Sequence, residues 1–120
     1  MLRRTRTGRA TFTRTRKVAV ITVTTPKFQI AKTLITPGAQ DAFAATGESP
    51  LAFIFGRHAK GDWGDVDAED AALNDEALKD GSRLLSAYHL KDGTKIWVIT
   101  EAVGDNGHRE ATTILLPEEY

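Results

Sequence analysis

The chain changes from helical to strand periodicity near Gly81, and this change restricts the folds that it can adopt. Before that point, three segments carry the start and stop signals of helices; after it, three segments are rich in apolar and β-branched residues at strand spacing. Helices that are followed by consecutive strands are typical of the α+β class. We therefore predict an α+β fold with one or more N-terminal strands, three short helices and a C-terminal three-stranded antiparallel meander, with the helices packed on one face.

The three helices are predicted from their caps. They run from Thr36-Pro37 to Gly47, from Ser49-Pro50 to Gly61, and from about Ala68 to Lys79, with Asp67 as the cap and Gly81 as the stop of the third. In the second helix, the spacing of Leu51, Ile54 and Phe55 predicts one buried face. His58, one turn further along, falls on the same face.

The strands are predicted from β-branched and apolar runs. They cover Val18–Thr24, Phe28–Ile35, Arg83–Leu90, Lys95–Ala102 and Glu110–Leu116. Asp92-Gly93 favours a type I′ hairpin with a two-residue loop between the third and fourth strands. That loop places Tyr88 opposite Trp97, on a face that also carries Ser86 and Glu101. Because this face is the more polar one, we expect the opposite face to meet the helices.

The charge of the chain is distributed unevenly. The 16 basic and 16 acidic side chains balance, but residues 1–17 carry seven of the basic ones and no acidic one, which leaves residues 18–120 with a net charge of −7. We interpret residues 1–17 as a flexible basic arm and residues 18–120 as a single α+β domain, since the length suits one domain. The arm could hold nucleic acid by neutralising phosphates, or be a solvated extension without a partner.

The absence of certain residues and runs excludes several classes of function. The chain has no cysteine, so disulfides, zinc–thiolate sites and thiol catalysis are excluded. No apolar run approaches the ~18 residues that cross a bilayer, and no secretory signal pattern is present. The sequence has no glycine-rich phosphate loop, no nucleophile elbow and no HExxH motif. We expect a cytoplasmic protein with no cofactor, no metal and no membrane partner.

The C-terminal two-thirds of the chain resembles a group of known proteins. The stretches RHAKGDWGDVDAED, RLLSAY, IWVITEA and TTILLPEEY are similar to a family of small bacterial proteins of unassigned activity found on plasmids and integrative elements. The resemblance covers residues 28–120 and implies a bacterial cytoplasmic protein associated with mobile elements. Two segments depart from the family pattern. Residues 1–25 lie outside it, and the loop VGDNGHRE is longer than the Asp-Arg-Ser turn expected there, with Arg109 in place of that arginine.

The segment HAKGDWGDVD, residues 58–67, concentrates polar and aromatic groups between two predicted helices. His58 followed by Asp62 could be a general base with an orienting acid. The alternative is a satisfied histidine at the edge of the core, its ring bonded to a carbonyl or to Asp62. Trp63 lies between two glycines, where it could plug the end of the core or stand exposed as a docking platform.

Other polar residues near this segment have structural explanations. Asp62, Asp65, Asp67 and Asp70 are hard oxygen donors, but their spacing does not match a calcium loop, so we expect no metal site. Asn74 shares an inward helix face with apolar residues, and a buried amide needs partners. We expect Asn74 to brace the loop that contains Trp63.

Three functions remain open from the sequence alone, and whether the chain is an enzyme is undecided. The first is a small accessory protein of mobile elements that docks, as a monomer or homodimer, onto a host or defence-system protein. The second is a metal-independent, toxin-like ribonuclease of barnase- or RelE-like architecture. The third is a nucleic-acid-binding protein that uses the basic arm. We favour the first, because no catalytic signature is present.

Each function has its own candidate residues. The binding surface, where the loop should meet the meander, would contain Trp63, Asp65, Tyr88, Trp97 and Glu101. A ribonuclease site would contain His58, Asp62, Tyr88, Arg109 and Thr112.

Overall fold

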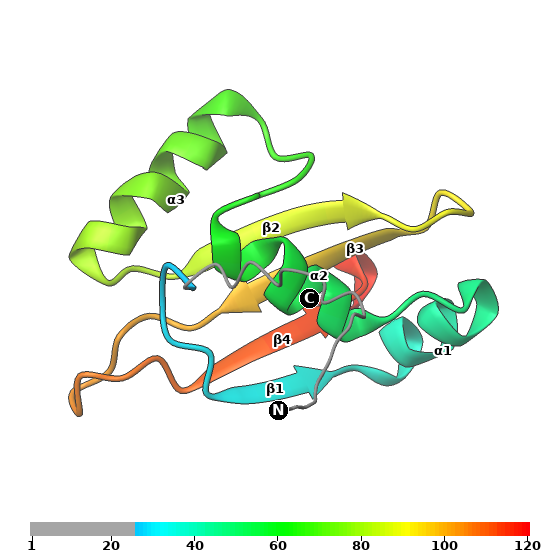
Figure 1. Ribbon diagram of the computed structural model, residues 1–120, viewed down its shortest axis with the longest axis horizontal. Helices are drawn as coiled ribbons and strands as arrows, with labels where there is room; N and C mark the ends of the chain where they lie inside the picture. Colours follow the sequence, from blue (N-terminus) through cyan, green and yellow to red (C-terminus); the bar gives the residue numbers. More distant parts are fainter. Residues whose placement is uncertain (1–25) are drawn as a thin grey trace, which may run out of the picture.

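The computed structural model describes residues 26–120, which form a four-stranded sheet and its covering helices (Figure 1). The elements in chain order are β1 (Lys32–Ile35), α1 (Pro37–Thr46), α2 (Pro50–Gly56), the 3-10 turn η1 (His58–Lys60), α3 (Ala68–Asp80), β2 (Leu84–His89), β3 (Lys95–Thr100), β4 (Ala111–Leu115) and the 3-10 turn η2 (Pro117–Glu119). The predicted α+β class is therefore confirmed. The basic arm and the strand predicted over residues 18–24 lie outside the described residues.

The sheet is mixed, which corrects the predicted arrangement. β2, β3 and β4 form the predicted antiparallel meander, but β1 joins the same sheet in parallel beside β4, giving the order β1-β4-β3-β2. Parallel neighbours need a long connection, and here it contains the helices and two further strands. The strand predicted over residues 28–35 contracts to β1, because the Phe28 ring packs against His58 and Trp63 instead.

α1 and α3 begin and end where their caps predict. Thr36 and Asp67 each accept a hydrogen bond from a backbone N–H of the first helical turn, and Gly47 and Gly81 end the helices in the left-handed conformation. No helix within residues 26–120 has both the length and the apolar character needed to cross a membrane.

α2 is shorter than predicted. It ends at Gly56, and Arg57 breaks the helix with φ of −129° and ψ of −64°. His58 therefore belongs to η1 and not to α2. This change of direction allows the imidazole to point at the sheet.

The register of the β2–β3 hairpin differs by one residue from the predicted one. Tyr88 pairs with Ile96 and not with Trp97. The loop has three residues and ends on Gly93 with a φ of 88°, as in a type I turn followed by a left-handed glycine. Because successive side chains of a strand point to opposite faces, this slip places Tyr88 and Trp97 on opposite faces of the sheet.

One face of the sheet is completely covered along β2, β3 and β4. Its alternate side chains on β2, β3 and β4 are all 0% exposed: Leu84, Ser86, Tyr88, Ile96, Val98, Thr100, Thr112 and Ile114. α1 and α2 supply the apolar partners of this face, including Phe43 and Phe53. α3 contacts β2 and runs at an angle to it (Figure 1). The predicted assignment of the faces is therefore wrong, since the face with Ser86 and Tyr88 is the one that meets the helices.

Candidate functional site

The loop after η1 runs along the outer side of β2 and pairs with it. Ala87 N donates to Trp63 O at 3.0 Å and Asp65 N donates to Ala87 O at 2.6 Å, so Gly64 and Ala87 form a parallel bridge. Gly64 has a φ of 73°, and a Cβ on it would lie 2.0 Å from Ala87 O. Only glycine permits this approach. The loop and the meander do meet, and their contact covers the edge of the sheet.

His58 occupies the middle of a buried row of polar side chains. Its Nδ1 lies 2.6 Å from Ser86 Oγ, and its Nε2 lies 2.8 Å from Thr100 Oγ1. Thr100 Oγ1 lies in turn 2.7 Å from Thr112 Oγ1. All four side chains are buried. The row ties η1 to three adjacent strands beneath the helical layer.

The surroundings of His58 keep its ring neutral. Burial, and after it the positive charge of Arg109, lowers the pKa of His58 to about 3. A neutral imidazole donates from one ring nitrogen and accepts at the other, which suits two hydroxyl partners. The predicted pairing of His58 with Asp62 is wrong, because both ring nitrogens face hydroxyls. The alternative, a histidine whose ring is hydrogen-bonded within the chain, agrees with these contacts. Its partners are Ser86 and Thr100 and not a carbonyl.

Asp62 and Tyr88 belong to a second cluster, at the start of the loop. Arg57 Nε donates to Asp62 Oδ2 at 2.7 Å, and this hydrogen bond holds the pKa of Asp62 below its usual range. The Arg57 guanidinium also lies 4.4 Å from the centre of the Tyr88 ring. Burial raises the pKa of Tyr88, whose hydroxyl donates to Asp62 O at 2.6 Å. Tyr88 therefore anchors the loop as a neutral phenol.

Trp63 closes a small second core. Its indole is 6% exposed and packs with Ala77 and Leu84, while Nε1 donates to Asp75 Oδ1 at 3.1 Å. The exposed docking platform considered from the sequence is therefore absent, and packing is the role that the structure gives to Trp63.

Asn74 fastens α3 to the edge of β2. Its Nδ2 donates to Leu85 O at 2.7 Å, and its Oδ1 accepts from Leu85 N at 3.1 Å. The side-chain amide thus pairs with both backbone groups of one strand residue. Asn74 braces β2 and not the loop, which corrects the prediction.

Arg109 ties α3 to the ends of β2 and β3. Its Nη1 donates to Ser82 O at 2.7 Å and to Glu101 O at 3.0 Å, and its Nη2 donates to Ala77 O at 2.9 Å. Ala77 lies in the last turn of α3, where the helix dipole favours a cation. Burial lowers the pKa of Arg109. Carbonyl oxygens of the chain itself therefore hold the guanidinium of Arg109, which we considered as part of a ribonuclease site.

The five residues predicted to form one binding surface do not share one. They are Trp63, Asp65, Tyr88, Trp97 and Glu101, of which Trp63 and Tyr88 are buried. Asp65 lies at the β2 edge, with Oδ2 2.6 Å from His89 Nδ1. Trp97 lies on the opposite face of the sheet, where its ring centre is 5.7 Å from that of Tyr120. The shift of the hairpin register is the physical reason for this separation.

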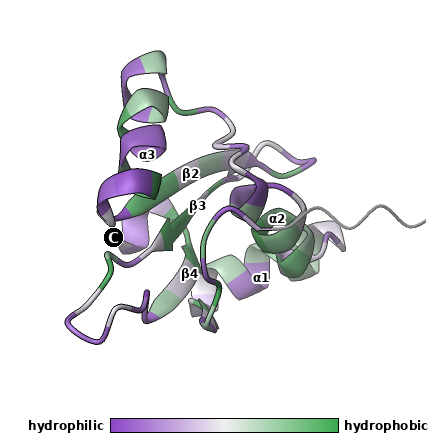
Figure 2. Cartoon of the chain, turned by 60° about the vertical axis from the view of Figure 1, so that its left-hand side comes forward, coloured by the Kyte–Doolittle hydropathy of each residue, from purple (hydrophilic) through white to green (hydrophobic). Residues whose placement is uncertain are grey.

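A surface that the sequence analysis did not single out lies over β1 and α2. All four residues of β1 are exposed, and within residues 26–120 β1 has a strand neighbour only on the β4 side. A groove of about 200 Å³ runs between β1 and α2, and Figure 2 shows α2 coloured as hydrophobic. The exposed apolar residues of this region, which we name the β1–α2 surface, are Leu34, Ile35, Leu51 and Phe55.

The predicted buried face of α2 is confirmed for Ile54 but wrong for Leu51 and Phe55, and this is why the surface was missed. Leu51 and Phe55 are 54% and 45% exposed, whereas Phe53 and Ile54 are buried. A short helix that is apolar on every side gives no periodic signal of which side faces the core. The only available signal was the unusually apolar composition of residues 50–56 as a whole.

Within the described part of the chain, no group of three or more histidine, aspartate or glutamate side chains is placed to hold a metal ion. Comparison of the chain with protein-family models, with curated proteins and with solved structures found no match.

Proposed function

We propose that this chain is a protein-binding module: a small bacterial accessory protein of mobile elements that docks onto a host or defence-system protein through the β1–α2 surface. One observation carries the proposal. Within residues 26–120, apolar side chains are exposed beside a sheet edge that pairs with no other strand. Four of the five residues considered for catalysis, in contrast, are at most 5% exposed and hydrogen-bonded within the chain. The bacterial and mobile-element context rests on the sequence resemblance alone.

The arrangement of the polar residues disfavours the ribonuclease alternative. Metal-independent RNA cleavage needs an accessible base that takes up a proton near neutral pH. His58 is fully covered and its pKa is about 3. Thr112 is equally covered. The nucleic-acid alternative depends on residues 1–17, which lie outside the described residues.

The form of the β1–α2 surface supports docking of an extended segment. An edge strand presents backbone N–H and C=O groups that a strand of another protein can pair with. The groove beside it is lined by Leu34, Ile35 and Leu51. Because alternate side chains of a strand point the same way, such a groove would take every second residue of the incoming strand. The partner we infer therefore offers an extended segment with apolar residues at alternate positions.

Photo-crosslinking in a bacterial host tests this proposal. A photoreactive amino acid replaces Leu51, and a control replaces Leu73, which is 62% exposed but lies on α3. We expect one discrete crosslinked protein from position 51 and none from position 73. The substitution Leu34→Lys should abolish that product, because it places a charge in the groove.

Two outcomes would overturn the proposal. One is the absence of any crosslinked protein at position 51 when the chain is expressed at its natural level. The other is cleavage of RNA by the purified chain that is lost in His58→Gln with the fold intact, which would favour the ribonuclease.

A further inference from the structure

Arg109 carries a buried positive charge that no carboxylate neutralises by direct contact within residues 26–120. Its three side-chain hydrogen bonds all go to carbonyl oxygens. A guanidinium has five N–H donors, so the Nε hydrogen and one Nη2 hydrogen take no part in these bonds. Removing a cation from water is unfavourable, and the carbonyl oxygens around this guanidinium carry only partial negative charges. The side chain therefore has both the charge and the donors to bind an anion.

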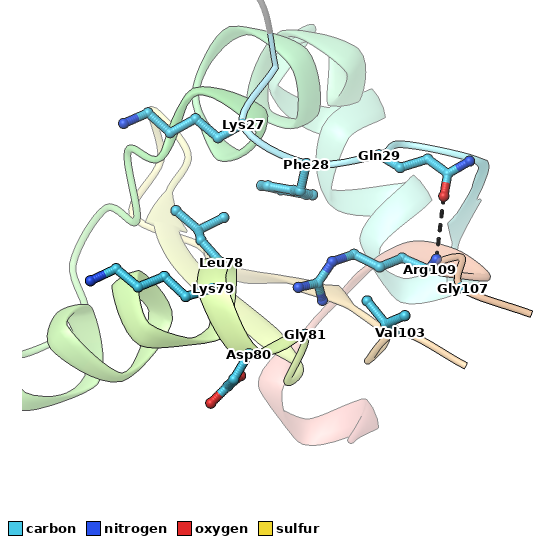
Figure 3. A pocket seen from close by; sticks show the side chains of 10 residues that line it. All are labelled: Lys27, Phe28, Gln29, Leu78, Lys79, Asp80, Gly81, Val103, Gly107 and Arg109. Carbon is cyan, nitrogen blue, oxygen red and sulfur yellow. Dashed lines mark hydrogen bonds between the residues drawn. The ribbon is translucent and has the colours of Figure 1, made fainter. Parts of the chain in front are cut away.

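The guanidinium of Arg109 lies in a pocket between α3, the segment before β1 and the loop after β3 (Figure 3). The pocket has a volume of about 410 Å³, within the range of small-molecule sites, and Phe28, Leu78 and Val103 form its apolar walls. Figure 3 shows the Arg109 side chain reaching between these walls, with Lys27 and Lys79 extending outward at the rim.

Asp80 is the one acidic residue that lines the pocket, and it is engaged elsewhere. Its carboxylate accepts from Ser82 N at 2.8 Å, and Figure 3 shows it turned away from the guanidinium. Asp80 acts on Arg109 only at a distance, since no ion pair joins them in the described part of the chain. Among residues 26–120, three cationic side chains and one carboxylate thus line the pocket or its rim.

We propose that this pocket binds a small organic molecule with one oxyanion group, a phosphate monoester or a carboxylate, joined to an aromatic or apolar body. The oxyanion meets the two remaining N–H donors of Arg109, since hydrogen bonds between a guanidinium and an oxyanion are among the strongest in proteins. The body packs against Phe28 and Leu78. This inference goes beyond the proposed function and uses none of the residues of the β1–α2 surface, so either can fail without the other.

An NMR titration of the full chain tests the inference. The probes are phenyl phosphate, benzoate and inorganic phosphate, with benzyl alcohol as a neutral control that keeps the aromatic ring. We expect phenyl phosphate or benzoate to shift the Arg109 Nε–H signal and the Phe28 ring signals in a saturable way at millimolar concentration. The tighter of the two identifies the anion, and benzyl alcohol should leave the Arg109 signal in place.

Substitutions on the rim provide the second measurement. Arg109 itself is not substituted, because its hydrogen bonds hold α3 to the strand ends and its loss could unfold the chain. Lys27→Gln and Lys79→Gln should each weaken binding of the tighter probe by roughly threefold, as expected for partly exposed charges. Lys95→Gln, outside the pocket, should leave it unchanged. The inference is wrong if no probe moves the Arg109 Nε–H signal, if benzyl alcohol moves it equally, or if the rim variants bind as the unsubstituted chain does.

Discussion

The two edges of the sheet are built in opposite ways. At the β2 edge, Gly64 bridges Ala87, and Asn74 binds both backbone groups of Leu85. At the β1 edge, all side chains are exposed, and within residues 26–120 no strand lies on the outer side. Several of the residues that look functional in this sequence, namely Trp63, Asp65 and Asn74, serve the closed edge. The residues of the open edge have no feature that singles them out in the sequence.

The physical demands of the two edges explain this difference. An unpaired strand edge attracts other chains, so an edge that is closed must be covered by groups that satisfy its backbone. Covering β2 takes a glycine at positive φ, a buried amide and a buried indole, and each is unusual enough to stand out in a sequence. An open edge needs only exposed apolar side chains. In this chain, a residue that stands out in the sequence therefore marks a position under structural constraint, and not a binding surface.

The largest expected effect lies at the tightest contact of the closed edge. In Gly64→Ala, the new Cβ would lie 2.0 Å from Ala87 O and 2.6 Å from Tyr88 Cδ1 at a φ of 73°. We expect the free energy of unfolding, measured in urea, to fall by about 4 kcal/mol, because backbone strain and overlap add. Gly47→Ala is the control: its φ is 75° but nothing lies within 4 Å, so we expect a loss of about 1 kcal/mol. Equal losses would refute the close contact.

The polar row beneath the covered face should make stability depend on pH. Folded His58 has a pKa of about 3, whereas 6.5 is the ordinary value. Between these values the unfolded chain binds a proton that the folded chain does not, so stability falls as the pH decreases. The loss of free energy of unfolding begins below pH 6.5 and reaches about 3 kcal/mol by pH 4. Above pH 6.5, His58 does not make the free energy of unfolding depend on pH.

The variant His58→Gln separates this effect from that of the carboxylates. Asp62 also has a lowered pKa, so its contribution is lost only as the pH falls through that low folded value. Subtracting the variant's urea-denaturation stability from that of the unsubstituted chain at each pH leaves the His58 part. If the stabilities of the variant and of the unsubstituted chain change in parallel between pH 6.5 and pH 4, His58 is not neutral and buried.

A smaller effect is expected at the amide that covers β2. Asn74→Ala leaves the N–H and C=O of Leu85 without their partners, which should lower the free energy of unfolding by about 2 kcal/mol. Glu76→Ala on the exposed side of the same helix should change it by less than about 0.5 kcal/mol. A similar result for both variants in urea denaturation would mean that Asn74 does not fasten the edge.

The smallest effect on stability is expected at the open edge. Leu34 and Leu51 are 46% and 54% exposed, so Leu34→Lys and Leu51→Lys should change the free energy of unfolding by less than about 0.5 kcal/mol. Ile54→Lys, at a buried position of the same region, should prevent folding. A thermal unfolding series distinguishes these cases. Strong destabilisation by Leu34→Lys would show that the β1–α2 surface is covered within the chain.

Local signals in the sequence predicted the elements and the antiparallel meander, but not the register of the hairpin or the pairing of β1. Thr36 and Asp67 begin α1 and α3 because their side chains satisfy N–H groups a few residues away, an interaction visible in a short window. The hairpin was predicted too, but its loop has three residues and ends on Gly93, where two residues were expected. This difference shifts the register by one residue and moves Trp97 to the face opposite Tyr88. The parallel pairing of β1 with β4 joins segments far apart in the chain and leaves no local signal.

The candidate site shows the same limit. His58 and Asn74 stand out in the sequence as polar residues on apolar helix faces, and Arg109 as a cation in the polar loop before the last strand. Their partners come from other elements, such as the Ser86 hydroxyl of β2 and the Thr100 hydroxyl of β3. Whether a buried polar group is satisfied or available for chemistry depends on these distant partners, so the sequence could locate the groups but not assign their roles.

Hydrogen–deuterium exchange of the full chain, followed by mass spectrometry of its peptides, tests the difference between the two edges most directly. If β2 is closed and β1 is open, the amides of β2 exchange as slowly as those of the central strand β3, and those of β1 exchange on average at least about tenfold faster. Equal protection of β1 and β2 would contradict the open edge, and rapid exchange of β2 would contradict the closed one.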